Sequence, residues 1–307
     1  MTCAALRTPK HSFLENYATG IDFGLKFGSG FRNPSLKLSK NNSTLGGTSA
    51  LTAWLVRSVK AAREVQKPFF HLEFDEVFPP ETYRRMMEAM PVSTDYRALP
   101  GRNNVNITEQ GVSTRIKVDL FREYVRHFAA QKRDIWRQVG DALCSMEVQE
   151  AFVERLAPVM EFRFGPGYRK VGLYPIPILT RDTGGYRIPE HTDTEWKGIT
   201  VQFYLPPDQS ITHVGTIFSE RLPDGSFQPT TRMKFAPNTG YAFTVGDDTW
   251  HSVDPVGPEV KSRDSILLTY FVDEGLLRRF RNRGRRLGNC ALNEIRRLKR
   301  SVLPGRI

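Results

Sequence analysis

The chain has 307 residues, of which 39% are hydrophobic and 25% charged, with a mean hydropathy of −0.41. No run of about 18 apolar residues occurs, which excludes a membrane-spanning helix and favours an ordinary globular domain with extensions. The three cysteines, Cys3, Cys144 and Cys290, are far apart and odd in number, which excludes a disulfide framework and a cysteine-based metal site. Free thiols suit a reducing compartment, so we expect a cytoplasmic protein.

The formal net charge of +11 is concentrated at the C-terminal end of the chain. Residues 276–307 contain eleven Lys or Arg and one Glu, which amounts to +10 and leaves about +1 for everything before them. The larger part of the chain is therefore electrically balanced, and nothing in it indicates attraction of a polyanion such as nucleic acid.

The basic tail also carries a helical pattern of apolar residues. These residues recur every three or four positions and comprise Leu287, Ala291, Ile295, Leu298 and Val302. The stripe favours a helix docked on the domain, or else a solvated one. Binding of the tail to an acidic partner or a membrane surface is the alternative, and nucleic acid is the least favoured.

The first half of the chain has the pattern of an extension followed by helices. Residues 1–50 are rich in Gly, Ser, Thr and Asn, which predicts a poorly ordered or loosely packed segment. Apolar residues at helical spacing predict one helix over 51–65, another over 81–90, and one or two over 121–152. A strand is expected over 69–74 and a polar loop over 93–115.

From Tyr168 onward the pattern changes to short strands separated by Gly and Pro turns, which is typical of a β-sandwich or barrel. The predicted strands span 168–175, 188–193, 200–205, 215–219, 231–235, 242–245, 250–254 and 265–272. We therefore predict three regions: an N-terminal extension over 1–65 with one helix, a β-rich domain over 66–275 and a basic tail or helix over 276–307.

Two histidines and an aspartate have the spacing of a metal site. His191 and Asp193 are two positions apart, so on a strand both side chains point to the same face. His251 lies 58 residues after Asp193, which leaves room for several strands to fold back beside the first. Two imidazoles and one carboxylate can occupy one face of an octahedral metal and leave the opposite face open, an arrangement that suits Fe(II).

Arg263 and Ser265 follow the second histidine and are also two positions apart. A guanidinium binds a carboxylate through two hydrogen bonds, and a hydroxyl can donate another. Each hydrogen bond to a charged group contributes about 1.5–3 kcal/mol, which is enough to anchor a dicarboxylate in a partly dry pocket.

The ordered set His191-x-Asp193, His251 and Arg263-x-Ser265 resembles the Fe(II)- and 2-oxoglutarate-dependent dioxygenase superfamily, in its prolyl-hydroxylase-like, bacterial branch. The similarity extends from about Lys67 to Asp273. It includes the segments Lys170–Pro175, Gly185–Glu190, Lys67–Asp75 and Phe78–Tyr83.

The resemblance implies a mainly β fold with supporting α-helices, namely a double-stranded β-helix (jelly roll) with N-terminal helices packed on one sheet. It implies Fe(II) on His191, Asp193 and His251, with no catalytic residue beyond these ligands, and 2-oxoglutarate on Arg263, Ser265 and Tyr174. With O2, such an enzyme hydroxylates an unactivated C–H bond and releases succinate and CO2. Desaturation or cyclisation needs only a different placement of the target carbon.

The substrate is not specified by the sequence, and a small molecule or a carrier- or peptide-linked group is expected. Arg181, Trp196 and His213 are candidate substrate contacts because they flank the metal ligands in the sequence. Two alternatives stay open: a cupin-like metalloenzyme that does not use 2-oxoglutarate, and a non-catalytic jelly-roll binding module. The Arg263-x-Ser265 pair argues against the first, because it has no role without a dicarboxylate.

Overall fold

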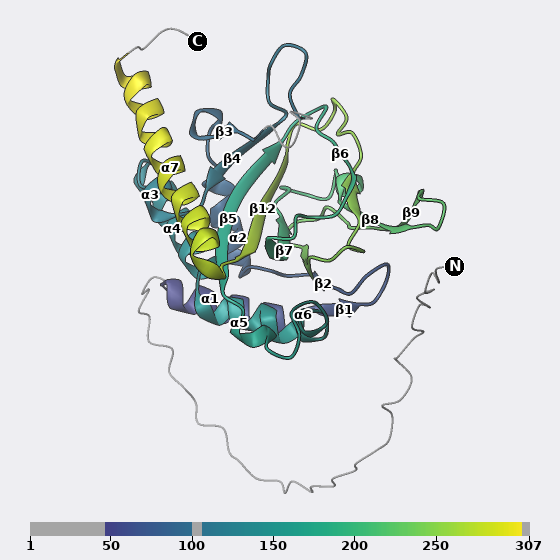
Figure 1. Ribbon diagram of the computed structural model, residues 1–307. Helices are drawn as coiled ribbons and strands as arrows, with labels where there is room; N and C mark the ends of the chain where they lie inside the picture. The colour runs from purple at the N-terminus through teal and green to yellow at the C-terminus, as the bar shows by residue number, and fades with distance from the viewer. Residues whose placement is uncertain (1–46, 100–105, 303–307) are drawn as a thin grey trace, which may run out of the picture. The chain divides into compact units, whose positions relative to one another are not determined.

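Two antiparallel sheets form the frame of the fold in the computed structural model, which describes residues 47–99 and 106–302 (Figure 1). The eight-stranded sheet has the strand order β1-β2-β10-β7-β12-β5-β4-β3, and the four-stranded sheet has the order β6-β11-β8-β9. The strands of the larger sheet are β1 (Arg63–Val65), β2 (His71–Phe74), β3 (Arg97–Ala98), β4 (Arg115–Asp119), β5 (Leu173–Asp182), β7 (Lys197–Tyr204), β10 (Gly240–Thr244) and β12 (Arg263–Val272). Those of the smaller sheet are β6 (Ile188–His191), β8 (Ile217–Arg221), β9 (Phe227–Arg232) and β11 (His251–Val253).

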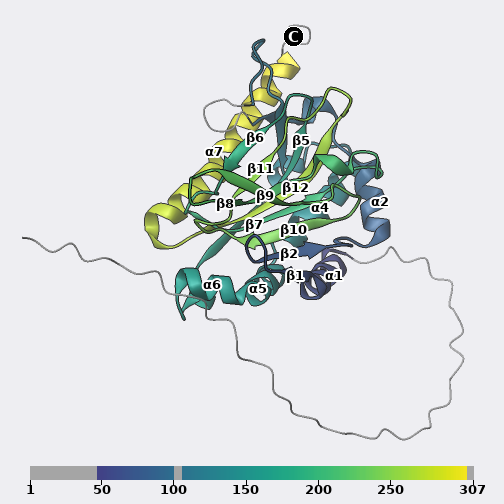
Figure 2. The same cartoon turned by 90° about the vertical axis from the view of Figure 1, so that its right-hand side faces the viewer.

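Seven helices accompany the sheets in the described part of the chain. They are α1 (Thr48–Ala61), α2 (Pro80–Glu88), α3 (Arg122–Val125), α4 (Ala130–Leu143), α5 (Met146–Arg155), α6 (Ala157–Phe164) and α7 (Gly275–Val302). Figure 2 shows α1 beside β1 and β2, with α5 and α6 next to it. Of the described helices, none combines the length and the apolar character needed to cross a membrane.

The strict alternation of side chains along the central strands separates two environments. In β7, Ile199, Val201 and Phe203 join an apolar core shared with the helices. The intervening Thr200 and Gln202 point to the opposite face, toward the smaller sheet. Because neighbouring side chains of a strand leave on opposite faces, one strand can seal the helical core and present polar groups on its other side.

The strand β12 repeats this division. Ile266, Leu268 and Tyr270 belong to the core with the helices, whereas Arg263 and Leu267 line a cavity between the sheets. A second apolar cluster fills the rest of the space between the sheets and is rich in aromatic rings. It includes Tyr204, Phe218, Phe235, Tyr241 and Phe243.

Most predicted elements are present, with shifted ends. The helix predicted over 51–65 is α1, and the segment 121–152 contains three helices instead of one or two. The strand predicted over 168–175 begins at Leu173 and extends to Asp182, and the one predicted over 231–235 is β9, which ends at Arg232. The helix α6 was not predicted. The prediction for residues 1–50 falls almost entirely outside the described residues.

The prediction that the C-terminal tail docks through its apolar stripe is wrong. The tail forms α7, but Leu287 and Leu298 in that stripe are 72% and 60% exposed. Polar side chains of α7, among them the buried Asn282, contact the domain instead. The helical period was therefore read correctly, while the side of the helix that packs inward was not.

One close backbone contact fixes the position of α4. A Cβ at Gly140 would lie 1.9 Å from the carbonyl oxygen of Leu120.

We expect Gly140→Ala to destabilise the fold by about 2 kcal/mol or more, because neither backbone can move without disturbing the core. Thermal unfolding of Gly140→Ala should show a clearly lowered Tm. The matched control is Gly288→Ala in α7, where nothing lies within 4 Å of the new Cβ, and its Tm should stay level or rise.

Candidate functional site

The two strands β6 and β11 place the two histidines of the motif side by side. His191 and His251 are direct partners in the antiparallel register, and their ring centroids are 4.2 Å apart. Asp193 follows two residues after His191, just beyond the end of β6. One ligand atom from each of the three residues lies within 4.8 Å of the others. The structure thus brings together the three residues that the sequence predicts as metal ligands.

Hydrogen bonds to the backbone orient both imidazoles in the same way. Nδ1 of His191 lies 3.0 Å from the carbonyl oxygen of Pro189, and Nδ1 of His251 lies 2.9 Å from that of Thr249. Since a carbonyl can only accept, each Nδ1 carries the proton and each Nε2 keeps its lone pair for a metal. Burial lowers the pKa of His251 to about 4 and also lowers that of His191, so both rings are neutral near pH 7.

The carboxylate of Asp193 is held ionised although it is buried. Burial alone would raise its pKa, but the ammonium group of Lys197, the neighbouring His251 and hydrogen bonds from Lys197 and Thr200 bring the pKa well below its usual range. Oγ1 of Thr200 donates to Oδ2 at 2.6 Å, and Nζ of Lys197 donates to Oδ1. The site therefore offers two neutral nitrogen donors and one anionic oxygen donor, which fits a divalent transition metal such as Fe(II).

The three candidate ligands line one cavity of about 100 Å3 between the sheets. Two arginines, Arg115 and Arg263, line the same cavity. The sequence predicts Arg263 as a carboxylate anchor, and the structure places it in this cavity with a fully buried side chain.

A buried aspartate joins the two arginines across three strands. Asp182 in β5 is the direct cross-strand partner of Arg115 in β4 and of Arg263 in β12. Arg115 donates from Nε and Nη2 to its two carboxylate oxygens at 2.6 and 3.0 Å, and Arg263 donates from Nη1 to Oδ2 at 2.8 Å. Two guanidiniums share one carboxylate, so this row of side chains carries a net charge of +1. A buried excess positive charge favours an anion in the adjoining space.

Tyr186 adds a hydrogen-bond donor to the same cavity. Its side chain is fully buried, and its ring lies 4.3 Å from the guanidinium carbon of Arg115. Burial raises the pKa of Tyr186, so the phenol keeps its proton. The phenol oxygen has no hydrogen-bond partner among the described residues. A buried donor without a partner is costly, which indicates that a bound acceptor belongs beside it.

Ser265 lies beside the cavity wall and supports it. Its hydroxyl accepts a hydrogen bond from Nε2 of Gln202 at 2.9 Å and lies 2.9 Å from Oγ1 of Thr180. Gln202 lines the cavity, and its Oε1 accepts from Tyr241 at 2.6 Å. In this arrangement Ser265 orients Gln202, and Ser265 itself does not line the cavity.

The structure does not place Tyr174 near the predicted cosubstrate site. In the register of β5 and β12, Tyr174 is paired with Phe271, eight positions from Asp182, which corresponds to roughly 26 Å along the strand. Its hydroxyl instead accepts a hydrogen bond from Arg286 of α7 at 3.4 Å. Tyr174 lies on the predicted strand, but its distance along that strand from Asp182 is too large for it to reach the same cavity.

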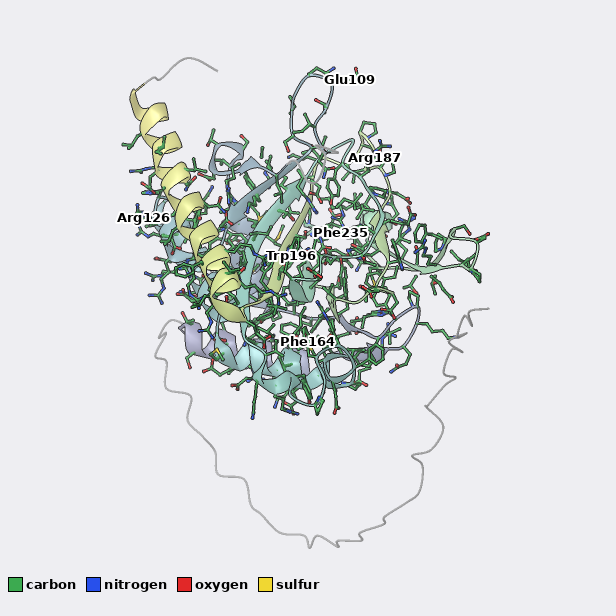
Figure 3. The ribbon with its side chains drawn as sticks, viewed as in Figure 1. Glu109, Arg126, Phe164, Arg187, Trp196 and Phe235 are labelled. Atoms are coloured by element: carbon green, nitrogen blue, oxygen red, sulfur yellow. The ribbon has the colours of Figure 1, made fainter. Side chains whose placement is uncertain are left out.

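The three predicted substrate contacts also lie away from this cavity. Arg181 points to the opposite face of β5 and donates to Asp264 at 2.7 Å. Trp196 packs against α7, where the guanidinium carbon of Arg281 is 5.0 Å from its ring (Figure 3). His213 lies in a short 3-10 turn, and its side chain is not among the residues that line the cavity.

Sequence reasoning missed Arg115, Asp182, Tyr186, Lys197 and Thr200. Tyr186 and Asp182 stand within ten residues of His191, and Lys197 and Thr200 follow Asp193 closely, so local position could have pointed to them. Arg115 gives no such signal, since it closes a segment that reads as a polar loop.

We expect His191→Ala or Asp193→Ala to abolish tight metal binding. Loss of a residue that only orients a metal ligand costs about 10–100-fold in affinity, so loss of a ligand itself should exceed about 100-fold. Titration of Fe(II), or of Co(II) as a stable substitute, by isothermal calorimetry measures this. His213→Ala is the matched control and should bind metal like the wild type. Equal affinity in the control and the two ligand variants would contradict the site.

No family model and no curated protein matches the chain. Solved structures do show similarity. A prolyl-4-hydroxylase from Pseudomonas putida is 13% identical, with a TM-score of 0.44 over 72% of this chain and 98% of that one. A prolyl hydroxylase from Trichoplax adhaerens, solved with a hypoxia inducible factor peptide, is 10% identical, with a TM-score of 0.44 over 74% and 91%. A 2OG-Fe(II) oxygenase family oxidoreductase from Burkholderia pseudomallei is 14% identical, with a TM-score of 0.39 over 75% and 93%.

Proposed function

We propose that this protein is an Fe(II)- and 2-oxoglutarate-dependent dioxygenase that hydroxylates an unactivated C–H bond and releases succinate and CO2. The proposal rests on a single cavity that is lined both by candidate metal ligands and by buried arginines. His191, Asp193 and His251 line it together with Arg115 and Arg263, the two arginines that Asp182 joins. A metal-binding face and a cationic face in one enclosed space suit a molecule that binds metal at one end and carries a carboxylate at the other.

The chain's own residues define how such a molecule is held. Arg115 uses Nε and Nη2 for Asp182, which leaves its Nη1 for a second acceptor. The phenol of Tyr186 supplies a further donor. We assign these two residues, with Arg263, to the distal carboxylate of 2-oxoglutarate, while Ser265 acts through Gln202.

Iron with 2-oxoglutarate and O2 would supply the oxidising chemistry, which belongs to the metal and cosubstrate. The surrounding residues keep the two histidines neutral and Asp193 ionised, and they keep water out of the cavity. The aromatic cluster around Tyr204, Phe218 and Phe243 excludes water from the space between the sheets. We also propose that the two sheets correspond to a double-stranded β-helix and that the protein works in the cytoplasm.

A second cavity provides room for the substrate. It has a volume of about 610 Å3, and Asp193 lies in its wall, so a molecule bound there would approach the metal. Phe69, Phe70 and Phe162 line its apolar part. The size suits a small molecule or one residue of a larger carrier or peptide, and the target carbon would enter from this side.

The proposal is tested by supplying the protein with Fe(II), 2-oxoglutarate and air and measuring succinate, with and without a panel of candidate substrates. We expect slow succinate formation by the protein alone and faster formation with a true substrate. Metal-loaded protein that neither binds 2-oxoglutarate in calorimetry nor forms succinate would support the cupin-like alternative. The His191→Ala variant controls for free iron.

We expect Arg115→Gln and Arg263→Gln each to raise the KM for 2-oxoglutarate by about 10- to 100-fold, because each loses charge-assisted hydrogen bonds of about 1.5–3 kcal/mol. Metal affinity should stay near that of the wild type, since neither side chain contacts a candidate ligand. Tyr174→Phe is the control and should leave the KM unchanged. Succinate formation at varied 2-oxoglutarate gives the KM values, and an unchanged KM in Arg115→Gln would refute its role.

A further inference from the structure

The helix α7 presents a row of apolar side chains outward. Seven of the described apolar side chains of α7 are at least 49% exposed. Five of them form what we call the apolar face: Leu276, Leu277, Phe280, Leu287 and Ile295. At 3.6 residues per turn they fall within an arc of roughly 100°. From Leu276 to Ile295 they extend over roughly 29 Å of the helix. A row of exposed apolar side chains along one helix is typical of an interaction site.

Polar contacts fix this orientation of the helix. Asn282 is buried and donates from Nδ2 to Oδ1 of Asp273 at 2.9 Å. The guanidinium of Arg286 pairs with Glu123 and lies 4.0 Å from the ring of Phe121.

Contacts near the middle of α7 support the same orientation. Tyr124 donates to the carbonyl oxygen of Arg286 at 2.7 Å, and Arg97 donates to the side chain of Asn289 at 3.1 Å. The side of α7 that meets the domain is thus polar, and the apolar face is turned away from it. Figure 1 shows α7 along the edge of the domain beside α3 and α4.

Charge decides what covers the apolar face. The sequence of α7 contains ten Lys or Arg and one Glu, a formal charge of +9. On a helical projection, Arg281 lies about 40° beyond one edge of the face, and Arg283 and Arg297 lie about 20° and 60° beyond the other. The side chains of Arg283 and Arg297 are 53% and 58% exposed although they also pair with Asp273 and Glu294. A second copy of the chain would bring an equal positive charge against it, so self-association through α7 is disfavoured. A membrane surface offers apolar acyl chains beneath anionic headgroups. It therefore complements an apolar stripe that has arginines on both sides.

We propose that α7 binds the surface of an anionic lipid bilayer. The helix lies parallel to the surface, with the apolar face inserted at the boundary of headgroups and acyl chains. The arginines beside it contact lipid phosphates and carboxylates. This docking would bring the oxygenase domain to a membrane without any segment crossing it, and it is independent of the proposed reaction.

The full-length protein is tested by co-sedimentation with vesicles of phosphatidylcholine alone and of phosphatidylcholine with phosphatidylserine. We expect binding to the anionic vesicles only, weakened by added salt. The triple variant Leu277→Gln, Phe280→Gln, Leu287→Gln keeps the charge and should bind at least about tenfold more weakly, since three apolar side chains no longer leave water.

The control variant Val112→Gln, Met146→Gln removes two apolar side chains that are about equally exposed elsewhere, at 61% and 60%, and should bind like the wild type. Circular dichroism verifies that each variant is folded. The proposal is overturned if the wild type does not bind anionic vesicles or if the triple variant binds them as well as the wild type. It is also overturned if the wild type is a dimer in solution that the triple variant converts to a monomer, because the face is then an interface between copies.

Discussion

The row Arg115–Asp182–Arg263 is the interaction on which the site depends. It crosses three neighbouring strands at one level, so each side chain is fixed by the sheet and by its partners. Burying three ionised groups is expensive, and one carboxylate between two guanidiniums recovers only part of that cost. One positive charge of the row stays without a carboxylate partner within it. This row therefore favours an anion in the adjoining cavity, whose lining also includes the two histidines and Asp193.

Much of this site could be predicted from spacing alone. His191 and Asp193 sit at the i and i+2 positions of a strand end, and the long interval to His251 is what a returning strand requires. Arg115 could not be found in this way, because cross-strand neighbours distant in the sequence leave no local pattern. Tyr174 shows the opposite error, in which a plausible motif was assigned to a point too far along the correct strand.

The same limit explains the fold predictions. Periodicity identified most helices and strands of the described residues. It missed α6 and displaced strand ends, since the ends depend on which neighbours each strand finds. For α7 the period alone could not reveal the orientation. Asp273 and Glu123 turn the polar side of that helix inward, and neither residue belongs to it.

The smaller sheet has a property that follows from its strand order. β6 is its edge strand, and in the described residues it is joined to the rest through β11, with a register irregularity between His251 and Val253. An ion that takes His191 from one of these strands and His251 from the other acts as a crosslink between them. Metal binding would then stabilise the pairing of β6 with β11 at the edge of this sheet. The metal of the proposed reaction would therefore also contribute to the stability of the fold.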